Sequence, residues 1–440
     1  MKQGRMVTVM AQGIKIGPAR ALRGTVAIPG DKSLSHRSIM LAGLADTPVK
    51  VRNFLASADC LSTVACMRKL GVSVHLRPDG EVTVQGKGLF GLSEPDNVLD
   101  AGNSGTTIRL LSGLLAGQPF FSVLTGDDSL RRRPMARIVT PLTQMGAKLV
   151  GRENSRYAPV AIEPTASLQG IRYAMPVASA QVKSAIMFAA LYAASPTTIT
   201  EPYLSRDHTE RMFGQFGAPV FRDNLSVTVN PVSSLRAPAV VDVPGDFSSA
   251  AFLLVAATII PNSEVLLTNV GINPTRTGLL DVLREMGADI EVVAERRSGE
   301  EPVADLRVRS ASLKGISVSS EIIPRLIDEI PILAVAALFA RGRTRIEGAE
   351  ELRVKETDRL RAMSCELVRM GGDVTERRDG LIIEGTGKLH TAECLAYADH
   401  RVAMALTVAG MASEGVCLDD AGCVAISFPG FFEVMEGCRA

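Results

Sequence analysis

A short phrase recurs along the whole chain, and it constrains the fold more than any other feature. It has the form apolar, two variable residues, apolar, glycine, small, variable, apolar, as in LTQMGAKL (142–149) and LREMGADI (283–290). Each copy is typical of a helix end, a terminating glycine and the start of a strand. The central glycines are Gly71, Gly146, Gly217, Gly287, Gly371 and, in a degenerate last copy, Gly437.

Successive glycines of this phrase lie 75, 71, 70, 84 and 66 residues apart. Alternating runs such as SVTVN (226–230) and LIIEG (381–385) indicate strands between the phrases. A helix-stop phrase can also recur without a structural repeat. The regular spacing instead favours six α/β repeats, each with helices and several strands.

A second phrase occurs twice, as VAIPGDKSLSH (25–35) and VDVPGDFSSAA (241–251). Three of the repeat glycines lie between the two copies and three follow the second. Pro and Gly between a strand and a helix suit a crossover between domains. We therefore expect domain I to comprise residues 1–28 plus 246–440 and domain II residues 29–245. Two crossovers would suit closure around a ligand.

Composition excludes several classes of protein. The 440 residues include 48 basic and 47 acidic ones, so no general affinity for nucleic acid or anionic membrane is indicated. The seven cysteines form no CxxC, and the five histidines are never four residues apart. A disulfide framework and a structural metal site are disfavoured, and a reduced, cytoplasmic protein is expected. No apolar run could cross a membrane, and the start is too short for a secretory signal.

The first PGD phrase places Lys32, Ser33 and Arg37 at the opening of an apolar helix, which Ser33 can cap. Free N–H groups beside two cations form a site for a phosphate or carboxylate. An ordinary helix cap with solvated basic residues is the alternative. The second copy, with Ser248 and Ser249, keeps the cap and lacks the cations.

Further motifs in the first half also precede apolar helices. LDAGNSGTTIRLL (99–111) is a glycine-rich turn that matches neither Walker A nor GxGxxG, and it can be purely structural. SLRRRPMARI (129–138) supplies four arginines, and Pro134 favours an extended backbone at Arg133. PVASAQVKSAI (176–186) contains Ser179 and Gln181, and LSRDHTERM (204–212) contains Arg206.

Acidic and basic residues alternate in three motifs of the second half. In PRLIDEIPILAVAALF (324–339), Asp328 and Glu329 precede a proline that suits the start of a helix. ELRVKETDRL (351–360) also fits a helix with internal salt bridges, for instance Glu351 to Lys355. The third motif is YADHRVAMAL (397–406).

Together these motifs resemble the 5-enolpyruvylshikimate-3-phosphate synthase family. The resemblance runs from about residue 14 to the end, with DKSxSHR, GNSGT, RRPM, SAQVKS, RDHTE, LIDEIPILAVAA, LRVKETDR and DHRVAM in order. It implies two similar domains, each of three βαβαββ-type repeats in an inside-out α/β barrel, with the active site in the interdomain cleft. A monomer that binds no nucleic acid, membrane or metal is expected.

The resemblance also implies the reaction. The enolpyruvyl group of phosphoenolpyruvate passes to the 5-hydroxyl of shikimate 3-phosphate and phosphate is released, on the pathway to chorismate and aromatic amino acids. No cofactor takes part. Both substrates are phosphorylated carboxylates, so several fixed cations are required, and this favours the basic motifs as a binding site.

The family pattern assigns roles to residues of this chain. The expected shikimate 3-phosphate site comprises Lys32, Ser33, Arg37, Ser179, Ala180, Gln181, Arg206, Asp328 and Lys355. The expected phosphoenolpyruvate site comprises Lys32, Gly105, Arg133, Gln181, Arg359 and Arg401. Asp328 is expected as the base toward the hydroxyl and Glu356 as proton donor and acceptor at the methylene, with Lys32 as the alternative.

Two departures from the pattern concern inhibition. Leu110 stands where many relatives have Pro, and Ile426 where many have Lys. Gly105 leaves room for glyphosate, which occupies the phosphoenolpyruvate pocket in this family. Two other functions fit a related scaffold. A UDP-N-acetylglucosamine enolpyruvyl transferase would have Lys-Asn at residues 32–33 and a loop cysteine, and a phosphate-ligand sensor would not need Asp328 and Glu356.

Overall fold

The computed structural model describes residues 9–10 and 13–440, so most of the N-terminal stretch judged too short for a secretory signal lies outside the described residues. The chain divides into two compact units. Unit 1 comprises residues 1–28, 245–296 and 303–440, and unit 2 comprises 29–244 and 297–302. The expected boundaries differ at two places, because Gly245 belongs to unit 1 and segment 297–302 belongs to unit 2.

The described residues form six four-stranded sheets, as the six repeats predict. Each sheet contains one parallel pair followed by two antiparallel pairings, for example β7 with β8, then β8 with β10, then β10 with β9. In unit 2 the orders are β7 (Leu99–Asp100), β8 (Ser122–Thr125), β10 (Tyr157–Glu163), β9 (Lys148–Gly151); β11 (Arg172–Ala174), β12 (Thr197–Thr200), β14 (Ser226–Val229), β13 (Val220–Asp223); and β15 (Val240–Asp242), β4 (Val49–Arg52), β6 (Val82–Gln85), β5 (Ser73–Leu76).

Three further sheets are formed mainly by unit 1. Their orders are β17 (Asp289–Ser298), β18 (Glu301–Arg309), β16 (Glu264–Gly271), β3 (Arg23–Ala27); β19 (Ser317–Val318), β20 (Gly342–Ile346), β22 (Gly380–Gly385), β21 (Asp373–Arg377); and β1 (Val9–Met10), β2 (Gly13–Ile16), β24 (Val416–Leu418), β23 (Glu393–Cys394). The last sheet joins the two ends of the chain, so its repeat is split between them.

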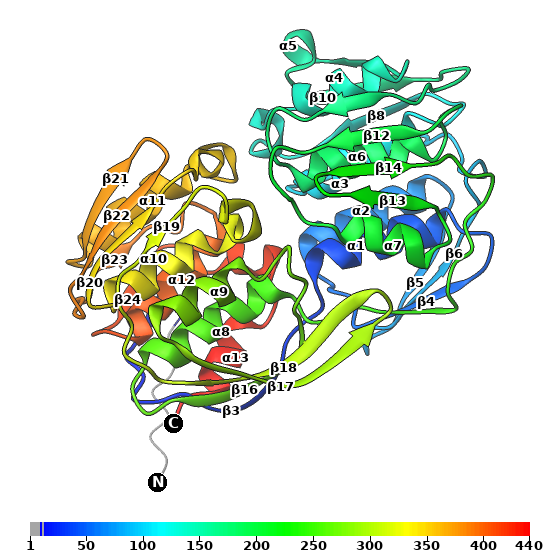
Figure 1. Cartoon of the computed structure of the whole chain (residues 1–440). Coiled ribbons are helices and arrows are strands. Elements are labelled where there is room, and N and C mark those ends of the chain that lie inside the picture. Colours follow the sequence, from blue (N-terminus) through cyan, green and yellow to red (C-terminus); the bar gives the residue numbers. More distant parts are fainter. Residues whose placement is uncertain (1–8, 11–12) are drawn as a thin grey trace. The chain divides into compact units, whose positions relative to one another are not determined.

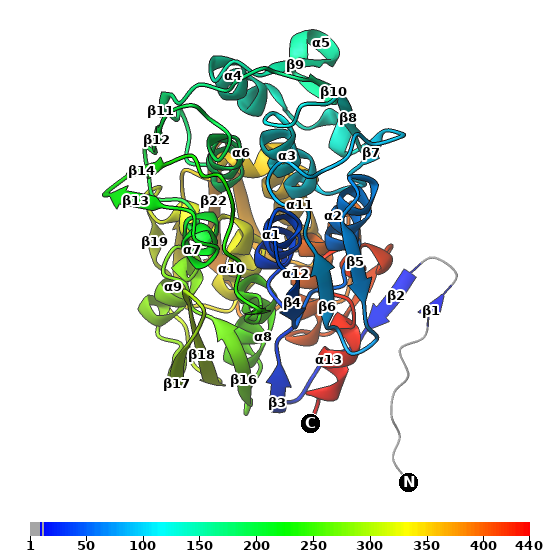
Figure 2. The same ribbon diagram turned by 90° about the vertical axis from the view of Figure 1, so that its right-hand side faces the viewer.

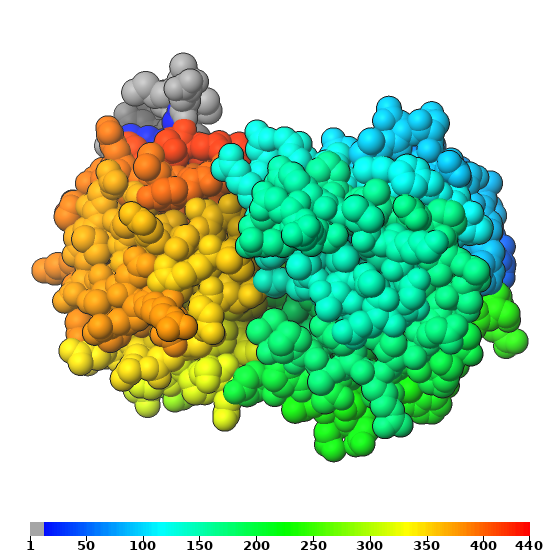
Figure 3. Space-filling view, turned by 90° about the horizontal axis from the view of Figure 1, so that it is seen from above, coloured from blue at the N-terminus to red at the C-terminus, as the bar shows by residue number. Residues whose placement is uncertain are grey.

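Helices that are apolar on nearly every side form the centre of unit 1, as Figure 1 shows. These are α8 (Phe247–Ile259), α10 (Ile330–Leu338) and α12 (His400–Met411), and every residue of α10 and α12 is buried. A helix without a polar face has to be enclosed by other elements. The C-terminal segments of unit 1, yellow and orange in Figure 3, form a continuous surface.

Unit 2 has a corresponding centre of α1 (Lys32–Gly43), α3 (Gly105–Leu115) and α6 (Ala180–Ala190), seen in Figure 2. Helices α3 and α6 approach so closely that a Cβ atom at Gly113 would lie 2.0 Å from the carbonyl oxygen of Ala185. The apolar cores of the two units are separate clusters. The remaining α-helices are α2 (Ala58–Lys69), α4 (Ala136–Gln144), α5 (Arg152–Ser155), α7 (His208–Gln215), α9 (Gly278–Met286), α11 (Arg359–Arg369) and α13 (Phe431–Gly437).

The repeat glycines behave as predicted in five of the six copies. Gly71, Gly146, Gly217, Gly287 and Gly371 have φ angles of 88°, 93°, 76°, 99° and 87°, the left-handed region that favours glycine. The prediction is wrong for Gly437, which is the last residue of α13 and has no strand after it. The strands that complete its repeat are β1 and β2, from the other end of the chain.

The described residues contain no helix with the length and hydropathy of a bilayer-crossing segment. No group of three or more His, Cys, Asp or Glu side chains among them is arranged to hold a metal ion.

Candidate functional site

Both PGD phrases begin a helix with an aspartate cap. The Oδ1 atom of Asp31 accepts the Leu34 N–H of α1 at 2.8 Å, and Oδ1 of Asp246 accepts the Ser248 N–H of α8 at 2.8 Å. The predicted cap at Ser33 is therefore wrong, because the extended backbone that a cap requires occurs at Asp31. Ser33 is the second residue of α1 and so lies within its first turn.

The two cations of the first PGD phrase have different surroundings. The Nζ atom of Lys32 lies 3.1 Å from Oδ2 of Asp59. Arg37 is buried and donates to the hydroxyls of Thr209 at 2.7 Å and Ser184 at 2.8 Å. Burial lowers the pKa of Arg37 to about 10, so its guanidinium still carries a charge at neutral pH.

The glycine-rich turn at the start of α3 faces two guanidinium groups. Ser104 caps this helix and Gly105 is its first residue. A Cβ atom at Gly105 would lie 3.0 Å from Nη1 of Arg109 and 3.5 Å from Nη1 of Arg133. Arg133 has the extended backbone predicted before Pro134 and donates from Nη2 to Oδ1 of Asn103 at 2.7 Å. Backbone N–H groups beside two guanidiniums can bind a phosphate or carboxylate.

The SAQVKS motif lies against the same turn. Ser179 caps α6, which begins at Ala180. The amide group of Gln181 accepts a hydrogen bond from Arg109 through Oε1 and donates from Nε2 to Oγ1 of Thr106 at 3.0 Å. Gln181 is therefore held by the start of α3, 72 residues away from Arg109 in sequence.

Arg206 lies in the segment that leads into α7, and its positive charge contributes to lowering the pKa of Arg37. The segment is fixed by a buried group of charges. Glu201 accepts the Ser205 N–H at 3.0 Å and is paired with Lys183 at 3.1 Å. Arg37 and Arg206, the two arginines of the expected shikimate 3-phosphate site, are therefore close enough for the charge of Arg206 to affect the pKa of Arg37.

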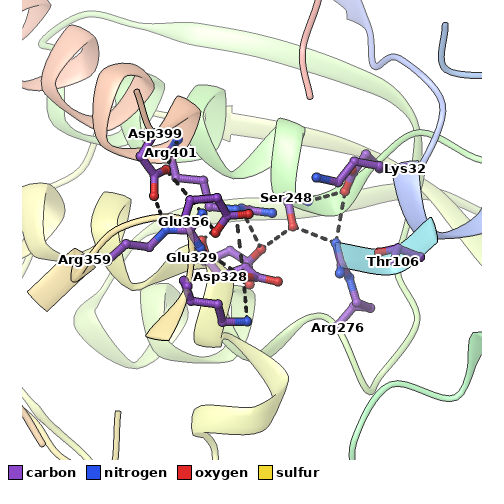
Figure 4. A network of polar contacts seen from close by, with 12 residues as sticks. Lys32, Thr106, Ser248, Arg276, Asp328, Glu329, Glu356, Arg359, Asp399 and Arg401 are labelled. Carbon is purple, nitrogen blue, oxygen red and sulfur yellow. Dashed lines mark hydrogen bonds and ion pairs between the residues drawn. The ribbon is translucent and has the colours of Figure 1, made fainter. Parts of the chain in front are cut away.

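In unit 1, one arginine connects three carboxylates, two of which, Asp328 and Glu356, belong to the expected site (Figure 4). The side chain of Arg359 is 1% exposed. Its Nη2 donates to Oε2 of Glu356 at 2.7 Å, and its Nη1 lies 3.3 Å from Oδ1 of Asp328. Its Nε donates to Oδ2 of Asp399 at 2.8 Å. Burial by itself lowers the pKa of Arg359, but these three carboxylates outweigh it and raise the pKa.

Two more cations lie near the Asp328 carboxylate. Its Oδ1 is 3.5 Å from Nζ of Lys355 and 4.0 Å from Nε of Arg401. Burial, reinforced by the charge of Arg359, lowers the pKa of Lys355, and Asp328 opposes this shift. The structure therefore brings together Asp328, Lys355, Glu356, Arg359 and Arg401, all predicted from the sequence.

The alternative in which residues 351–360 form one salt-bridged helix is wrong. Residues Glu350–Val354 form a short 3₁₀ helix, Lys355 is extended, and α11 begins only at Arg359. The amino group of Lys355 pairs with Asp328 from another part of the chain. Because the helical structure is interrupted at Lys355, the side chain of this lysine can reach the Asp328 carboxylate.

Sequence reasoning missed two supporting groups. One is Asp399, which is fully buried and caps α12. The other is a buried chain in which Nδ1 of His36 is 2.6 Å from Oγ1 of Thr63, and that oxygen is 2.7 Å from Oγ1 of Thr107. Thr107 donates to Ser104, so Thr63 must donate to Thr107 and the His36 Nδ1–H must donate to Thr63. An Asp directly before an apolar helix was the available signal for Asp399.

Comparison with known proteins identifies the family to which this chain is similar. The family model described as EPSP synthase (3-phosphoshikimate 1-carboxyvinyltransferase) matches residues 16–435. A protein of that enzyme name from Desulforudis audaxviator is 54% identical over 428 residues, covering 97% of this chain and 99% of the relative. One from Geobacter sulfurreducens is 53% identical, covering 95% and 97%.

Solved structures agree with these relatives. The 2.37 Å structure of EPSP synthase from Acinetobacter baumannii has a TM-score of 0.87 and 44% identity, covering 98% of both chains. The enolpyruvyl transferase NikO from Streptomyces tendae, 17% identical with a TM-score of 0.79 over 97% of both chains, shares the fold.

The fold is that of an enolpyruvyl transferase, and this confirms the predicted fold class. The chain belongs to the EPSP synthase family. It is an enzyme with 3-phosphoshikimate 1-carboxyvinyltransferase activity, so the resemblance based on its motifs is confirmed.

Proposed function

We propose that this chain transfers the enolpyruvyl group of phosphoenolpyruvate to the 5-hydroxyl of shikimate 3-phosphate and releases phosphate, as a step of the shikimate pathway. The observation that carries the residue assignments is the shared guanidinium of Arg359, which binds both Asp328 and Glu356. Two carboxylates held at fixed positions among cations suit a reaction with a proton acceptor, a proton donor and anionic substrates.

The proposed substrate contacts follow the family pattern of residues. Shikimate 3-phosphate would be bound by Lys32, Ser33, Arg37, Ser179, Ala180, Gln181 and Arg206 of unit 2 and by Asp328 and Lys355 of unit 1. Phosphoenolpyruvate would be bound by Lys32, Gly105, Arg133 and Gln181 of unit 2 and by Arg359 and Arg401 of unit 1. Charge-assisted hydrogen bonds of this kind are each worth about 1.5–3 kcal/mol.

Arg401, in unit 1, has one edge of its guanidinium without a hydrogen-bond partner among the described residues. Its Nη1 donates to the carbonyl oxygen of Asp328 at 2.9 Å, and its Nε faces the Asp328 carboxylate. Among the described residues, Nη2 of Arg401 donates no hydrogen bond. Arg359, by contrast, has carboxylate partners on all three nitrogens. We therefore propose that Arg401 contacts the anionic phosphoenolpyruvate more directly than Arg359 does.

The proton steps follow from the two carboxylates. Glu356 protonates the methylene carbon of phosphoenolpyruvate, which leaves a cationic centre at the adjoining carbon. The 5-hydroxyl oxygen attacks this centre while Asp328 takes the hydroxyl proton, giving a tetrahedral adduct. Glu356 then removes a proton from the new methyl group as phosphate leaves, and the proton held by Asp328 passes to the departing phosphate, which returns both carboxyl groups to their starting states. Glu356 suits this role because its side chain, at 19% exposed, is more open than that of Asp328 at 11%. Lys32 is the alternative donor.

We further propose a cytoplasmic monomer. All seven cysteines are free thiols, which is compatible with a reducing compartment. Light scattering during size-exclusion chromatography tests the monomer, which predicts a mass near 46.8 kDa.

A coupled assay for phosphate release tests the function. Shikimate 3-phosphate and phosphoenolpyruvate together should give phosphate and the enolpyruvyl product, and either substrate alone should give neither. Turnover only with UDP-N-acetylglucosamine as acceptor would support the other transferase. Binding of both ligands without phosphate release would support a sensor.

A further inference from the structure

The second PGD phrase leads into a buried polar chain in unit 1 that the proposed reaction does not use (Figure 4). Nη2 of Arg276 lies 3.0 Å from Oδ1 of Asp246, the cap of α8. The same nitrogen donates to Oγ of Ser248 at 2.6 Å. Ser248 in turn is hydrogen-bonded to Oε1 of Glu329, which directly follows Asp328 in sequence.

The direction of this chain is fixed by the hydroxyl group. A serine hydroxyl has one proton to donate. Because Oγ of Ser248 accepts from Arg276, its own proton points to Oε1 of Glu329. Ser248 therefore acts on Glu329 as a donor and holds this carboxylate in one orientation.

Glu329 is a carboxylate at a position where burial is unfavourable for a charged group. It is 1% exposed, and its Oε2 atom has no hydrogen-bond partner among the described residues. A buried carboxylate with an unsatisfied oxygen destabilises a fold unless a nearby cation compensates its charge. Glu329 forms an ion pair with Arg401, whose Nη1 is 3.7 Å from Oε1.

We infer that Glu329 is a positioning residue for Arg401 and that Ser248 orients Glu329 for this purpose. The carbonyl oxygen of Asp328 and the Glu329 carboxylate together fix the Nη1 edge of the guanidinium. This leaves the Nη2 edge for an anionic oxygen. The inference rests on the proposed function, in which that oxygen belongs to phosphoenolpyruvate. The second PGD phrase would then contribute to the site through Ser248, whereas the first phrase contributes through Lys32 and Arg37.

Glu329→Gln tests this inference, because it keeps the size of the side chain and removes its charge. We expect the KM for phosphoenolpyruvate to rise about tenfold, which corresponds to about 1.4 kcal/mol. The KM for shikimate 3-phosphate should stay within about twofold, since that substrate is assigned to other cations. Glu329→Asp keeps the charge and should raise the KM for phosphoenolpyruvate less than Glu329→Gln.

The matched control is Glu366→Gln in the same unit. Glu366 is also fully buried, but it is bonded to Leu395 and Tyr397 and not to Arg401. This control should lower the melting temperature without changing the ratio of the two KM values. A purely structural role of Glu329 would make Glu329→Gln behave like the control, and the inference would then be wrong.

Ser248→Ala provides a second test if Glu329→Gln does not fold. It leaves the carboxylate in place and should still raise the KM for phosphoenolpyruvate, by a smaller factor. In the double variant, Ser248→Ala should add little to Glu329→Gln, because the hydroxyl acts through the carboxylate. A strictly additive effect would contradict that order of action.

Direct binding separates this inference from the proposed function. Calorimetry with phosphoenolpyruvate alone, so that no turnover occurs, should give a weaker Kd for Glu329→Gln than for the unmodified enzyme. Equal Kd values would overturn the role of Glu329 while leaving the proposed function intact. Failure of the unmodified enzyme both to bind and to turn over phosphoenolpyruvate would overturn the proposed function itself, and the inference with it.

Discussion

Arg359 and Asp399 form a bidentate ion pair in the interior of unit 1. Nε of Arg359 lies 2.8 Å from Oδ2 and Nη2 lies 3.2 Å from Oδ1 of the carboxylate. Oδ1 also accepts the backbone N–H of Arg401 at 2.9 Å. Asp399 therefore ties the first residue of α11 to the first turn of α12, and it fixes two arginines of the proposed site at once.

Asp399→Asn should destabilise the protein, because it leaves the Arg359 guanidinium with less compensating charge while an asparagine can still cap α12. Removing one partner of a buried pair typically costs about 3–5 kcal/mol. Urea unfolding measures this loss. Asp358→Asn is the control, since Asp358 caps α11 with a side chain that is 32% exposed. A control with an equally large effect would contradict the importance of burial.

Asp328→Asn should retain binding of shikimate 3-phosphate and lower kcat by roughly 10²–10⁴, the usual contribution of general acid–base catalysis. The amide keeps the shape of the carboxylate but cannot take the hydroxyl proton. Rapid-quench measurement of the first turnover, together with calorimetry for binding, separates the two effects. Near-normal kcat would remove Asp328 from the role of base.

Glu356→Gln should lower kcat by a similar factor if Glu356 transfers protons at the methylene. It is also expected to abolish exchange of methylene protons of phosphoenolpyruvate with D₂O, which NMR detects. Persistent exchange in Glu356→Gln and its loss in Lys32→Met would transfer the role to Lys32.

Gly105→Ala should raise the inhibition constant of glyphosate more than the KM for phosphoenolpyruvate. The added methyl would lie 3.0 Å from Nη1 of Arg109, so this flexible guanidinium must shift by a few tenths of an ångström. Crowding in a filled pocket costs about 1–3 kcal/mol, and the bulkier inhibitor should bear more of it. Steady-state inhibition at varied phosphoenolpyruvate gives both constants. Equal increases would show that Gly105 does not discriminate between the two ligands.

His36 should make folding stability depend on pH. Burial, with the charges of Lys32 and Arg37, lowers the pKa of His36 well below its usual value of 6.5. The unfolded chain then binds a proton that the folded chain does not. Stability is therefore fully present above about pH 6.5 and is lost as the pH falls toward the folded pKa, by up to about 1.4 kcal/mol per pH unit.

The measurement is urea unfolding from pH 8 to pH 5. His36→Asn should flatten the decline below pH 6.5, whereas His75→Asn, which alters an exposed histidine of β5, should not. The same slope in the His36 variant and the unmodified protein would show that other groups cause the acid sensitivity.

The sequence by itself determined the repeat architecture, because helix ends, left-handed glycines and strand alternation are local patterns. Five repeat glycines have the predicted conformation, and the charged motifs of unit 1 contain the residues that meet around Asp328. Local patterns were insufficient where a choice depended on distant segments. Gly437 has no following strand because its repeat is completed from the other end of the chain.

Only the tertiary structure decided which charged and polar groups are partners. Arg359 and Asp399 are 40 residues apart, and Arg109 and Gln181 are 72 apart, so no spacing in the sequence indicates either contact. The local charge pattern around Lys355 indicates Glu351, four residues away, and gives no sign of Asp328, whose Oδ1 lies 3.5 Å from Nζ of the lysine. Ion pairs form between groups that folding brings within a few ångströms in a desolvated interior, and that proximity comes from the packing of helices, not from neighbouring residues.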